Sequence, residues 1–304
     1  MDWAALGVGL YLAVLLGIGI VASRGMSSVR EYFAADKSLG FWAVAFSARA
    51  TGESAWLLLG LTGMGAVVGV RAFWVVLGEV LGVTAAWLLM AGRFRRLTGR
   101  YDAITVPDYL EARFLDDDQI LRKISAIPLV LFVTIYVAAQ IDATGKAFDS
   151  FLGVGYFTGL AIGFGVVLLY ASAGGFRAVV WSDVFQGSLM FVGLVGLPIV
   201  ALVRLGGPGP LVAALGRIDA GLLSPLGPQG LSAASVLGIG GLVLIGLGFL
   251  GSPQIFVRFL ALRGVEEIPQ GATVALIWTL LADSGAVLIG MLGRVVLDQP
   301  GAQM

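Results

Sequence analysis

The chain contains no cysteine and no histidine, and only 12% of its 304 residues are charged. The absence of cysteine excludes disulfide bonds, thiolate metal ligands and cysteine nucleophiles. The absence of histidine removes a common general base and metal ligand, and with it the usual hydrolase triads and zinc sites. Soluble domains carry about 25% charged residues, so this low charge content indicates an integral membrane protein. We therefore expect neither an enzyme nor a cofactor, and a net charge of zero gives no reason to expect a nucleic-acid partner.

Long apolar stretches are what the chain has in abundance. Hydrophobic residues make up 58% of it, and its 45 glycines suit closely packed membrane helices. A helix needs about 20 residues to cross a hydrocarbon core. We expect a single transmembrane domain over residues 1–304 with about eight helices, at approximately 3–22, 41–70, 72–92, 124–148, 155–173, 183–203, 233–261 and 270–295. The first stretch is too long for a signal peptide and lacks a basic leader, so we expect a retained helix.

The distribution of Lys and Arg predicts the orientation, because cytoplasmic loops carry an excess of both. With the N-terminus outside, most of them, Arg258 included, fall on the inner side, whereas the outer segments hold Arg71, Lys146, Arg204, Arg217 and Arg294. The polar loop 93–123 contains TVPDYLEARF, which predicts a short interfacial helix with Pro107 in its first turn. Its basic residues are interpreted as orientation signals and contacts with anionic lipid. We expect a multi-pass protein of the inner (plasma) membrane.

The stretch FSARATGESAWLLLGLTG, residues 46–63, places two opposite charges in the middle of an expected span. Arg49 and Glu53 are four residues apart, so they fall on one helical face and can pair. Charged groups at this depth cost roughly 2.5–3.5 kcal/mol, so they persist where they pair or line a cavity. The pair either neutralises itself and holds two helices together, or shapes a gate or an ion path. The neighbouring Gly52 and Ser54 indicate a broken helix around a binding site.

Three more carboxylates fall within expected spans. Glu79 is a candidate partner of Arg49 or a protonatable relay, and simple packing as a neutral acid is the alternative. Asp142 is a candidate for an ion path, but Lys146 follows it by four residues, so a self-neutralising pair is equally consistent. Asp283 has no evident partner in sequence. It either binds a cation or meets Arg49 across the helix bundle.

A second interruption is expected in the seventh span, within GLGFLGSPQIF, residues 246–256. Pro253 removes a backbone donor and clashes with the preceding turn, while Gly248 and Gly251 allow the chain to unwind. Counted from the first broken helix, this interruption falls in the sixth helix, where a five-helix inverted repeat would begin again. A matched pair of interrupted spans indicates the midplane site of a secondary transporter.

Several long motifs resemble those of a known transporter family. They are DKSLGFW (36–42), the Ser/Ala/Trp pattern of 47–63, AGRFRRLT (91–98), ITVPDYLEARF (104–114), FVTIY (132–136), GGFRAVVWSDVFQGSLM (174–190) and GSPQIFVRFLA (251–261). Through them the chain resembles the sodium/solute symporter family, and within it the bacterial sodium/proline symporter branch. The resemblance implies an all-α, LeuT-like inverted-repeat fold with a first helix, a full first repeat and the start of a second. It also implies sodium-driven uptake by alternating access.

The resemblance assigns roles to particular residues. Sodium, the coupling ion, is expected at the backbone carbonyls of Ala50 and Glu53, with Ser54 as a serine that couples sodium to substrate. Asp183 matches a functionally sensitive aspartate and joins Arg49, Glu79 and Asp142 as candidates for ion path or coupling.

Residues expected near the substrate also follow from the resemblance. Gly52 stands where the proline branch has an aspartate, and Trp56 follows in the same motif. In the seventh helix Ile245, Phe249 and Pro253 stand where that branch has a Trp, a Tyr and a Pro around its substrate. The chain lacks both the Trp and the Tyr hydroxyl, a departure that bears on proline as the solute.

The family has more helices than this chain, which predicts a fragment, a split protein that needs a second chain, or a remnant without transport. The leading hypothesis is a sodium-coupled symporter that imports a small organic solute, either proline or another amino acid-like molecule. The alternatives are a proton-coupled transporter and a non-transporting membrane sensor or interaction module on a transporter scaffold.

Overall fold

The computed structural model describes residues 3–24, 26 and 28–297; the two ends of the expected domain and residues 25 and 27 lie outside the described residues. In the described part the only β-type pairing is an isolated parallel bridge between Leu39 and Leu262. Six helical runs of this part are long and apolar enough to cross a membrane: Trp3–Ser23, Phe41–Arg100, Ile120–Leu152, Tyr156–Leu205, Ala233–Gly251 and Val265–Leu297. The expected all-α membrane fold class is confirmed.

Two of these runs each cover a pair of expected spans. Phe41–Arg100 covers 41–70 and 72–92 and turns at the 3₁₀ helix η3 (Gly69–Ala72), where Gly69 has a φ of +58°. Tyr156–Leu205 covers 155–173 and 183–203, and Gly175 within it is non-helical, with φ 54° and ψ −151°. A Cβ at Gly175 would lie 2.6 Å from the carbonyl oxygen of Tyr32, so both conformation and space require glycine there.

The chain divides into two compact units. The first comprises Met1–Ser47, Ala91–Phe185 and Pro253–Glu267, and the second comprises Ala48–Met90, Gln186–Ser252 and Ile268–Met304. The first unit holds α1 (Trp3–Ser23), α2 (Val29–Ala34), η1 (Ala35–Lys37), the start of α3 (Phe41–Ala55), α6 (Gly92–Arg100), α7 (Val106–Phe114), α8 (Ile120–Leu152), the first part of α9 (Tyr156–Leu205), α12 (Pro253–Ala261) and η7 (Val265–Glu267).

The second unit holds the remaining elements. These are the end of α3, the π-helix η2 (Trp56–Leu61), α4 (Thr62–Val68), η3, α5 (Phe73–Ala85), the π-helix η4 (Ala86–Ala91) up to Met90, the second part of α9, α10 (Pro208–Ile218), η5 (Ala220–Leu223), α11 (Ala233–Leu247), η6 (Gly248–Gly251) and α13 (Ile268–Leu297).

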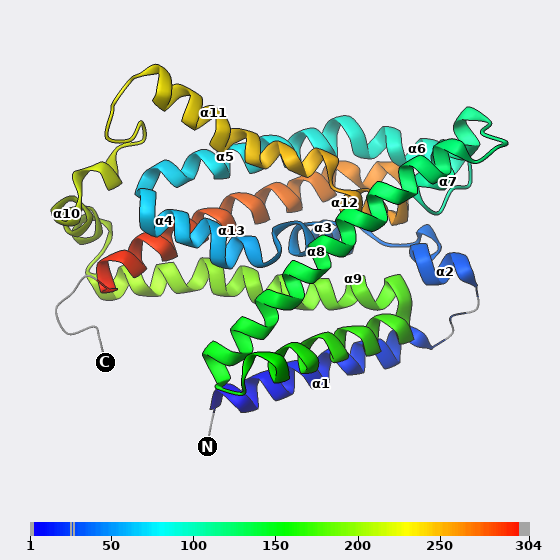
Figure 1. Ribbon diagram of the computed structural model, residues 1–304, viewed down its shortest axis with the longest axis horizontal. Helices are drawn as coiled ribbons and strands as arrows, with labels where there is room; N and C mark the ends of the chain where they lie inside the picture. The colour runs from blue at the N-terminus through cyan, green and yellow to red at the C-terminus, as the bar shows by residue number, and fades with distance from the viewer. Residues whose placement is uncertain (1–2, 25, 27, 298–304) are drawn as a thin grey trace. The chain divides into compact units, whose positions relative to one another are not determined.

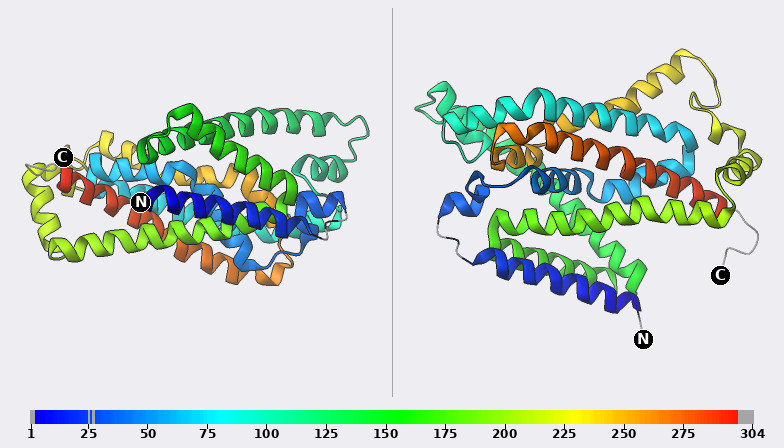
Figure 2. Two further views of the ribbon diagram at one scale, coloured as in Figure 1. Left: turned by 90° about the horizontal axis from the view of Figure 1, so that it is seen from below. Right: turned by 180° about the vertical axis from the view of Figure 1, so that it is seen from behind.

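Within the first unit, α1 runs beside the first part of α9, as both Figure 1 and the right-hand view of Figure 2 show. A Cβ at Gly19 of α1 would lie 2.7 Å from the Cβ of Tyr170, so the two helices touch at this glycine. Around it Leu15, Ala22, Tyr170 and Ala178 form a buried cluster. Small residues at such a crossing allow membrane helices to approach closely, where packing rather than the hydrophobic effect holds them.

The start of α3 is held by residues from far along the chain. The Leu39 N–H donates to the Ala261 carbonyl at 3.1 Å, and the Arg263 N–H donates back to Leu39 at 2.8 Å. The Glu267 carboxylate accepts a hydrogen bond of 2.8 Å from the Phe41 N–H. Because the first N–H groups of a helix have no partner within it, an acceptor here stabilises the start of α3.

The predicted helix in TVPDYLEARF is α7. Thr105 and Asp108 form a capping box at its start, in which each side chain accepts from the other residue's backbone N–H. Pro107 lies in the first turn, where its missing N–H costs nothing. Leu115 ends the helix in the left-handed conformation.

Within the second unit, α11 runs along α5, and α13 packs against α4 and α5 (Figure 1). The helices α5 and α11 contact each other through two glycines, Gly78 and Gly246. A Cβ at Gly246 would lie 2.0 Å from the carbonyl carbon of Gly78. The backbones therefore approach as closely as small residues permit. The second unit thus contains the part of α3 from Ala48 onward, with its break, and η6 of the second interruption.

Candidate functional site

The first expected break lies at Ser54. This residue has φ 53° and ψ −158°, which takes it out of the helical region inside α3, and the π-helix η2 follows from Trp56. The Trp56 N–H donates to the Ser54 hydroxyl at 3.3 Å. The helical path therefore changes direction at Ser54, as expected of a broken helix in a secondary transporter. Ala50 and Glu53, expected as sodium-binding carbonyls, both lie in the turn before Ser54.

Arg49 is the centre of a buried charge cluster in the second unit. Its side chain is fully buried and contacts three carboxylates: Glu53 in the next turn, Asp283 on α13 at 3.7 Å, and Glu79 on α5 at 4.0 Å. The three acidic side chains are buried too, at 2%, 0% and 8% exposure for Glu53, Asp283 and Glu79. The sequence gives Glu79 and Asp283 as separate candidate partners of Arg49, and in the structure both carboxylates contact it.

The cluster ties three helices together by electrostatics. Removing a charge from water at this depth is costly, and an oppositely charged neighbour offsets part of that cost. Oxygen atoms of Glu53, Glu79 and Asp283 lie within 4.8 Å of one another, a spacing that suits a cation. The Arg49 guanidinium already places a positive charge among them. The cluster therefore restrains the chain next to the break at Ser54.

The second expected interruption is also present. α11 ends at Leu247, the 3₁₀ helix η6 follows, Ser252 is extended, and Pro253 starts α12. The Phe249 ring in η6 lies 4.9 Å from the guanidinium carbon of Arg49, and the Trp278 ring of α13 lies 5.5 Å from it. Cations are attracted to aromatic faces at this range. Arg49 thus connects the first broken helix with the second interruption.

A second buried polar group lies in the first unit. Arg258 of α12 donates from Nη2 to Asp183 Oδ2 and from Nε to the Ser47 hydroxyl, each at 2.6 Å. Ser47 donates in turn to Asp183 Oδ2 at 2.6 Å. Arg258 is 4% exposed, and its Nη1 donates to the Gln254 carbonyl at 2.7 Å. The three side chains form a closed network that holds α3, α9 and α12 in fixed relation.

Asp142 stands apart from these two groups. It lies on α8 with a side chain that is 45% exposed, and it accepts hydrogen bonds from Lys146 at 2.7 Å and from the Tyr156 hydroxyl at 2.9 Å. The pair with Lys146 is one of the two interpretations that the sequence left open, and the structure adds a tyrosine to it. Its role in an ion path stays a prediction.

The residues expected near the substrate differ in their surroundings. Trp56 and Ile245 are 37% and 40% exposed, whereas Phe249 is 7% exposed beneath Arg49. Gly52 lies in the turn before Ser54. Pro253 begins α12 in the first unit.

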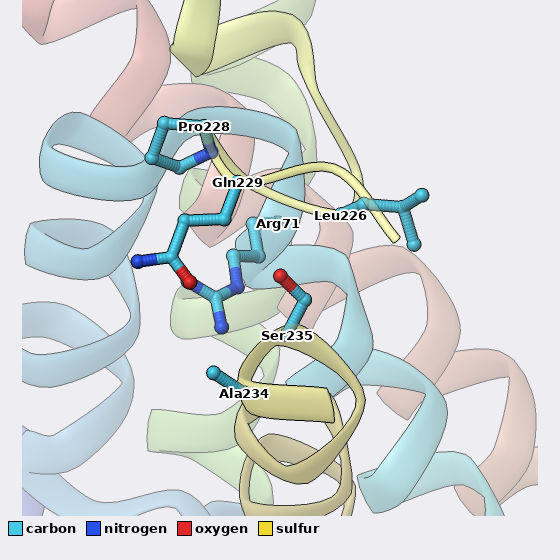
Figure 3. Close-up of a pocket in the computed structure, with 6 residues that line it drawn as sticks. All are labelled: Arg71, Leu226, Pro228, Gln229, Ala234 and Ser235. Carbon is cyan, nitrogen blue, oxygen red and sulfur yellow. The ribbon is translucent and has the colours of Figure 1, made fainter. Parts of the chain in front are cut away.

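A pocket of about 130 Å³ lies elsewhere in the second unit. Its walls come from three segments: the η3 turn, the loop after η5, and the first turn of α11 (Figure 3). The lining residues are Arg71, Leu226, Pro228, Gln229, Ala234 and Ser235. None of these residues belongs to the site expected from the sequence.

Sequence reasoning missed the partners of Asp183. Arg258 was counted among the inner-loop charges, which is wrong, because it is buried on α12. The signal was available, since position 258 falls inside the expected span 233–261 and an intramembrane cation needs a partner. Ser47 gave no signal of its own. Trp278, which covers Arg49, could not be told from an ordinary core residue.

Two interrupted helices that meet at a buried arginine are the arrangement typical of membrane transporters built from inverted repeats. The chain belongs to the sodium:solute symporter family, whose family model matches residues 32–302.

Individual relatives agree with this assignment. The chain is 39% identical to the high-affinity proline transporter PutP of Bacillus subtilis (strain 168) over 94% of this chain and 60% of that protein. It is 35% identical to the sodium/proline symporter of Escherichia coli (strain K12) over 93% of this chain and 56% of that one. A Na⁺-coupled sialic acid symporter has the same fold, with a TM-score of 0.80 at 19% identity over 96% of this chain and 60% of its own. The chain thus spans about 60% of the length of these proteins.

Proposed function

We propose that the chain forms part of a sodium-coupled symporter that imports a small organic solute by alternating access, with L-proline as the first solute to test. The contact between the two interrupted helices carries this proposal. Arg49, in the turn before Ser54, lies 4.9 Å from the Phe249 ring in η6. Interrupted helices that meet are the usual framework of ion and solute sites in secondary transporters. The proline specificity of two relatives supports the choice of solute.

Sodium binds, in this proposal, at the break in α3. The backbone carbonyls of Ala50 and Glu53 supply oxygen ligands, and the Ser54 hydroxyl lies at the break itself. Hard cations prefer such oxygen ligands. Sodium bound there would stabilise the unwound conformation, and the solute would then bind near Gly52 and Trp56.

The other expected residues act around this centre. Ile245 and Phe249 are the proposed solute neighbours on α11 and η6, and Pro253 marks the start of α12. Asp183 would contribute to coupling through its pair with Arg258.

Arg49 and its carboxylates are proposed to control the ion path by holding α3 in place. A guanidinium bound to groups on α5 and α13 restrains the turn that carries the sodium-binding carbonyls. We propose that Arg49→Ala loosens this turn and weakens sodium activation. Glu53→Gln keeps the shape of the side chain and is the matched variant. Unchanged sodium affinity in both variants would make the cluster a structural feature only.

The protein is a multi-pass membrane protein, and the orientation is part of the proposal. The excess of Lys and Arg in the loop 93–123 supports an inner position for that loop in the plasma membrane, which leaves the N-terminus outside. Membrane lipid is the surrounding partner. A second chain that carries the remaining helices of the family is a further proposed partner.

Uptake of labelled L-proline into proteoliposomes tests the proposal. The chain is reconstituted alone and after co-production with a second polypeptide that carries the remaining helices. Uptake should rise when an inward sodium gradient is imposed and stay at background when potassium replaces sodium. Equal uptake in the two salts would refute sodium coupling. Uptake driven by a proton gradient in the absence of sodium would indicate proton coupling instead of sodium coupling.

A further inference from the structure

The pocket beside Arg71 contains a positive charge without a partner. Among the residues that the structure describes, Arg71 forms no ion pair, and its buried Nε donates no hydrogen bond. Its guanidinium is nevertheless held in a narrow space. A Cβ at Gly238 would lie 2.5 Å from Nη2, and one at Gly227 would lie 3.3 Å from Nη1. Two glycines therefore leave room for this side chain. An unpaired guanidinium in such a space indicates that the pocket binds an anion.

The walls of the pocket are preformed. The Trp74 indole donates to the Pro225 carbonyl at 2.9 Å, and the Ser224 hydroxyl donates to the Gly227 carbonyl at 2.9 Å. A Cβ at Gly69 would lie 2.0 Å from the Leu222 carbonyl oxygen, so η3 and η5 are in direct contact. The loop is thus fixed by its own hydrogen bonds and by close packing. A fixed pocket loses little conformational entropy when a ligand binds.

Polar groups in the pocket complement the guanidinium. Figure 3 shows Arg71 next to Gln229 of the loop and Ser235 of α11. The Ser235 hydroxyl accepts from Ser232 at 3.1 Å, which leaves its own proton free to be donated. The pocket also lies at the N-terminal end of α11, where the helix dipole favours negative charge.

The ligand class follows from charge, shape and size. Arg71 is the single basic residue among those that line the pocket, which suits a monoanion better than a phosphate dianion. The planar guanidinium matches a carboxylate through two parallel hydrogen bonds. Leu226 and Pro228 add an apolar wall, which suits the hydrocarbon part of an organic acid. A volume of about 130 Å³ admits a small molecule only.

We propose that this pocket binds the carboxylate of a small organic acid, amino acids included, as a site separate from the one at the broken helices. That the pocket binds the same solute as the one transported rests on the proposed function. By the proposed orientation the pocket faces outside, so it would concentrate solute at the entrance of the transporter.

Cysteine labelling tests the pocket without any need for transport. The chain has no cysteine, so Ala234→Cys introduces a single thiol on an exposed lining residue. Its labelling rate is measured with sulfonatoethyl methanethiosulfonate, which is anionic, and with the cationic trimethylammonioethyl reagent. Val212→Cys on α10, 50% exposed and outside the lining, is the control thiol.

Relative to the control thiol, the anionic reagent should be favoured at position 234 by about tenfold, because a unit charge a few ångströms away changes the local reagent concentration. In an Arg71→Gln background this preference should disappear. Acetate and L-proline should slow labelling in the parent and not in Arg71→Gln, whereas L-prolinamide, which lacks the carboxylate, should not protect.

Three outcomes would overturn the proposal. They are equal rates for the two reagents, protection that survives Arg71→Gln, and protection by inorganic phosphate, chloride or vesicles with anionic headgroups that equals protection by acetate. Arg71→Lys, which keeps the charge without the planar fork, should retain the reagent preference and lose most of the protection. A protein that takes up proline without protection at position 234 would refute this pocket alone, and protection without uptake would refute the proposed function alone.

Discussion

Arg258 and Asp183 form a buried ion pair, with Nη2 of the arginine 2.6 Å from Oδ2 of the aspartate. The pair joins α12 to α9, and Ser47 of α3 bonds to both partners. Asp183 was singled out from sequence as a candidate for coupling. Its geometry shows a residue held by two donors from two other helices, so any movement of α12 or α3 must alter its surroundings.

Breaking this pair by changing one partner should destabilise the protein strongly. Arg258→Met leaves the aspartate nearly buried without its cation, and such changes cost about 3–5 kcal/mol. Asp183→Asn combined with Arg258→Met should recover part of the loss. Thermal unfolding in nanodiscs measures both. The exposed pair Asp142 and Lys146 is the matched control, and Lys146→Met should leave the melting temperature nearly unchanged. Equal losses at the two pairs would contradict this account.

The backbone at Ser54 predicts an unusual response to glycine. A φ of 53° with ψ of −158° is a conformation that side chains rarely adopt, and it costs about 1–3 kcal/mol. Ser54→Gly should therefore raise the free energy of unfolding by about 1 kcal/mol, while Ser54→Ala should not. Both variants lose the hydroxyl, so both should lose sodium activation if Ser54 binds the ion. A lower free energy of unfolding in Ser54→Gly would contradict a non-helical backbone at Ser54.

The close approach of α5 and α11 predicts a steric effect at Gly246. In Gly246→Ala the new methyl group would meet the Gly78 backbone at about 2.0 Å, so the helices must separate. We expect a loss of about 1–3 kcal/mol, typical of overpacking. Gly240→Ala on the same helix has nothing within 4 Å of its new Cβ and should be neutral or slightly stabilising. Chemical denaturation in mild detergent compares the two.

Lys37 predicts a dependence of stability on alkaline pH. Its side chain is buried and donates to the Thr98 carbonyl at 3.0 Å, and burial lowers its pKa from the usual 10.5. The folded protein therefore binds this proton less tightly than the unfolded chain does. Between the lowered pKa and about 10.5 the unfolded chain carries more protons, so this group's contribution to stability rises with pH.

Lys37→Met removes this titration. As the pH rises through the alkaline window, the free energy of unfolding of the parent should increase relative to that of the variant. Thermal unfolding at a series of pH values measures both. Lys123→Met, at an exposed position, is the matched control. If the free energies of unfolding of the parent and of Lys37→Met change equally with pH, the titration is not that of Lys37.

Much of this architecture could be predicted because membrane insertion leaves a strong local signal. Apolar stretches, the interruption at Gly248–Pro253 and the short helix α7 depend on residues close in sequence, and the described residues have a helix or a break at each. The resemblance to the family correctly predicted the all-α fold. The sodium ligands, the solute neighbours and the division into spans stay predictions.

Partners across helices were harder to predict, because charge alone does not specify a pair. The sequence leaves two interpretations of Asp283 open, and only the packing of the helices brings it to Arg49. Arg258 is buried, although the sequence suggests a loop charge. The pocket at Arg71 needs three segments to converge, and none of them carries a signal that a ligand binds there.

The hydrogen bond from the Phe41 N–H to Glu267 joins residues 226 positions apart. It has a consequence for the order of synthesis. At about 5–20 residues per second, Glu267 leaves the ribosome on the order of tens of seconds after Phe41. During that interval the first turn of α3 lacks its acidic cap, and Leu39 lacks its bridge to Leu262. The N-terminal end of the first broken helix can therefore reach its final place only after α12 has been made, so this part of the assembly is completed late.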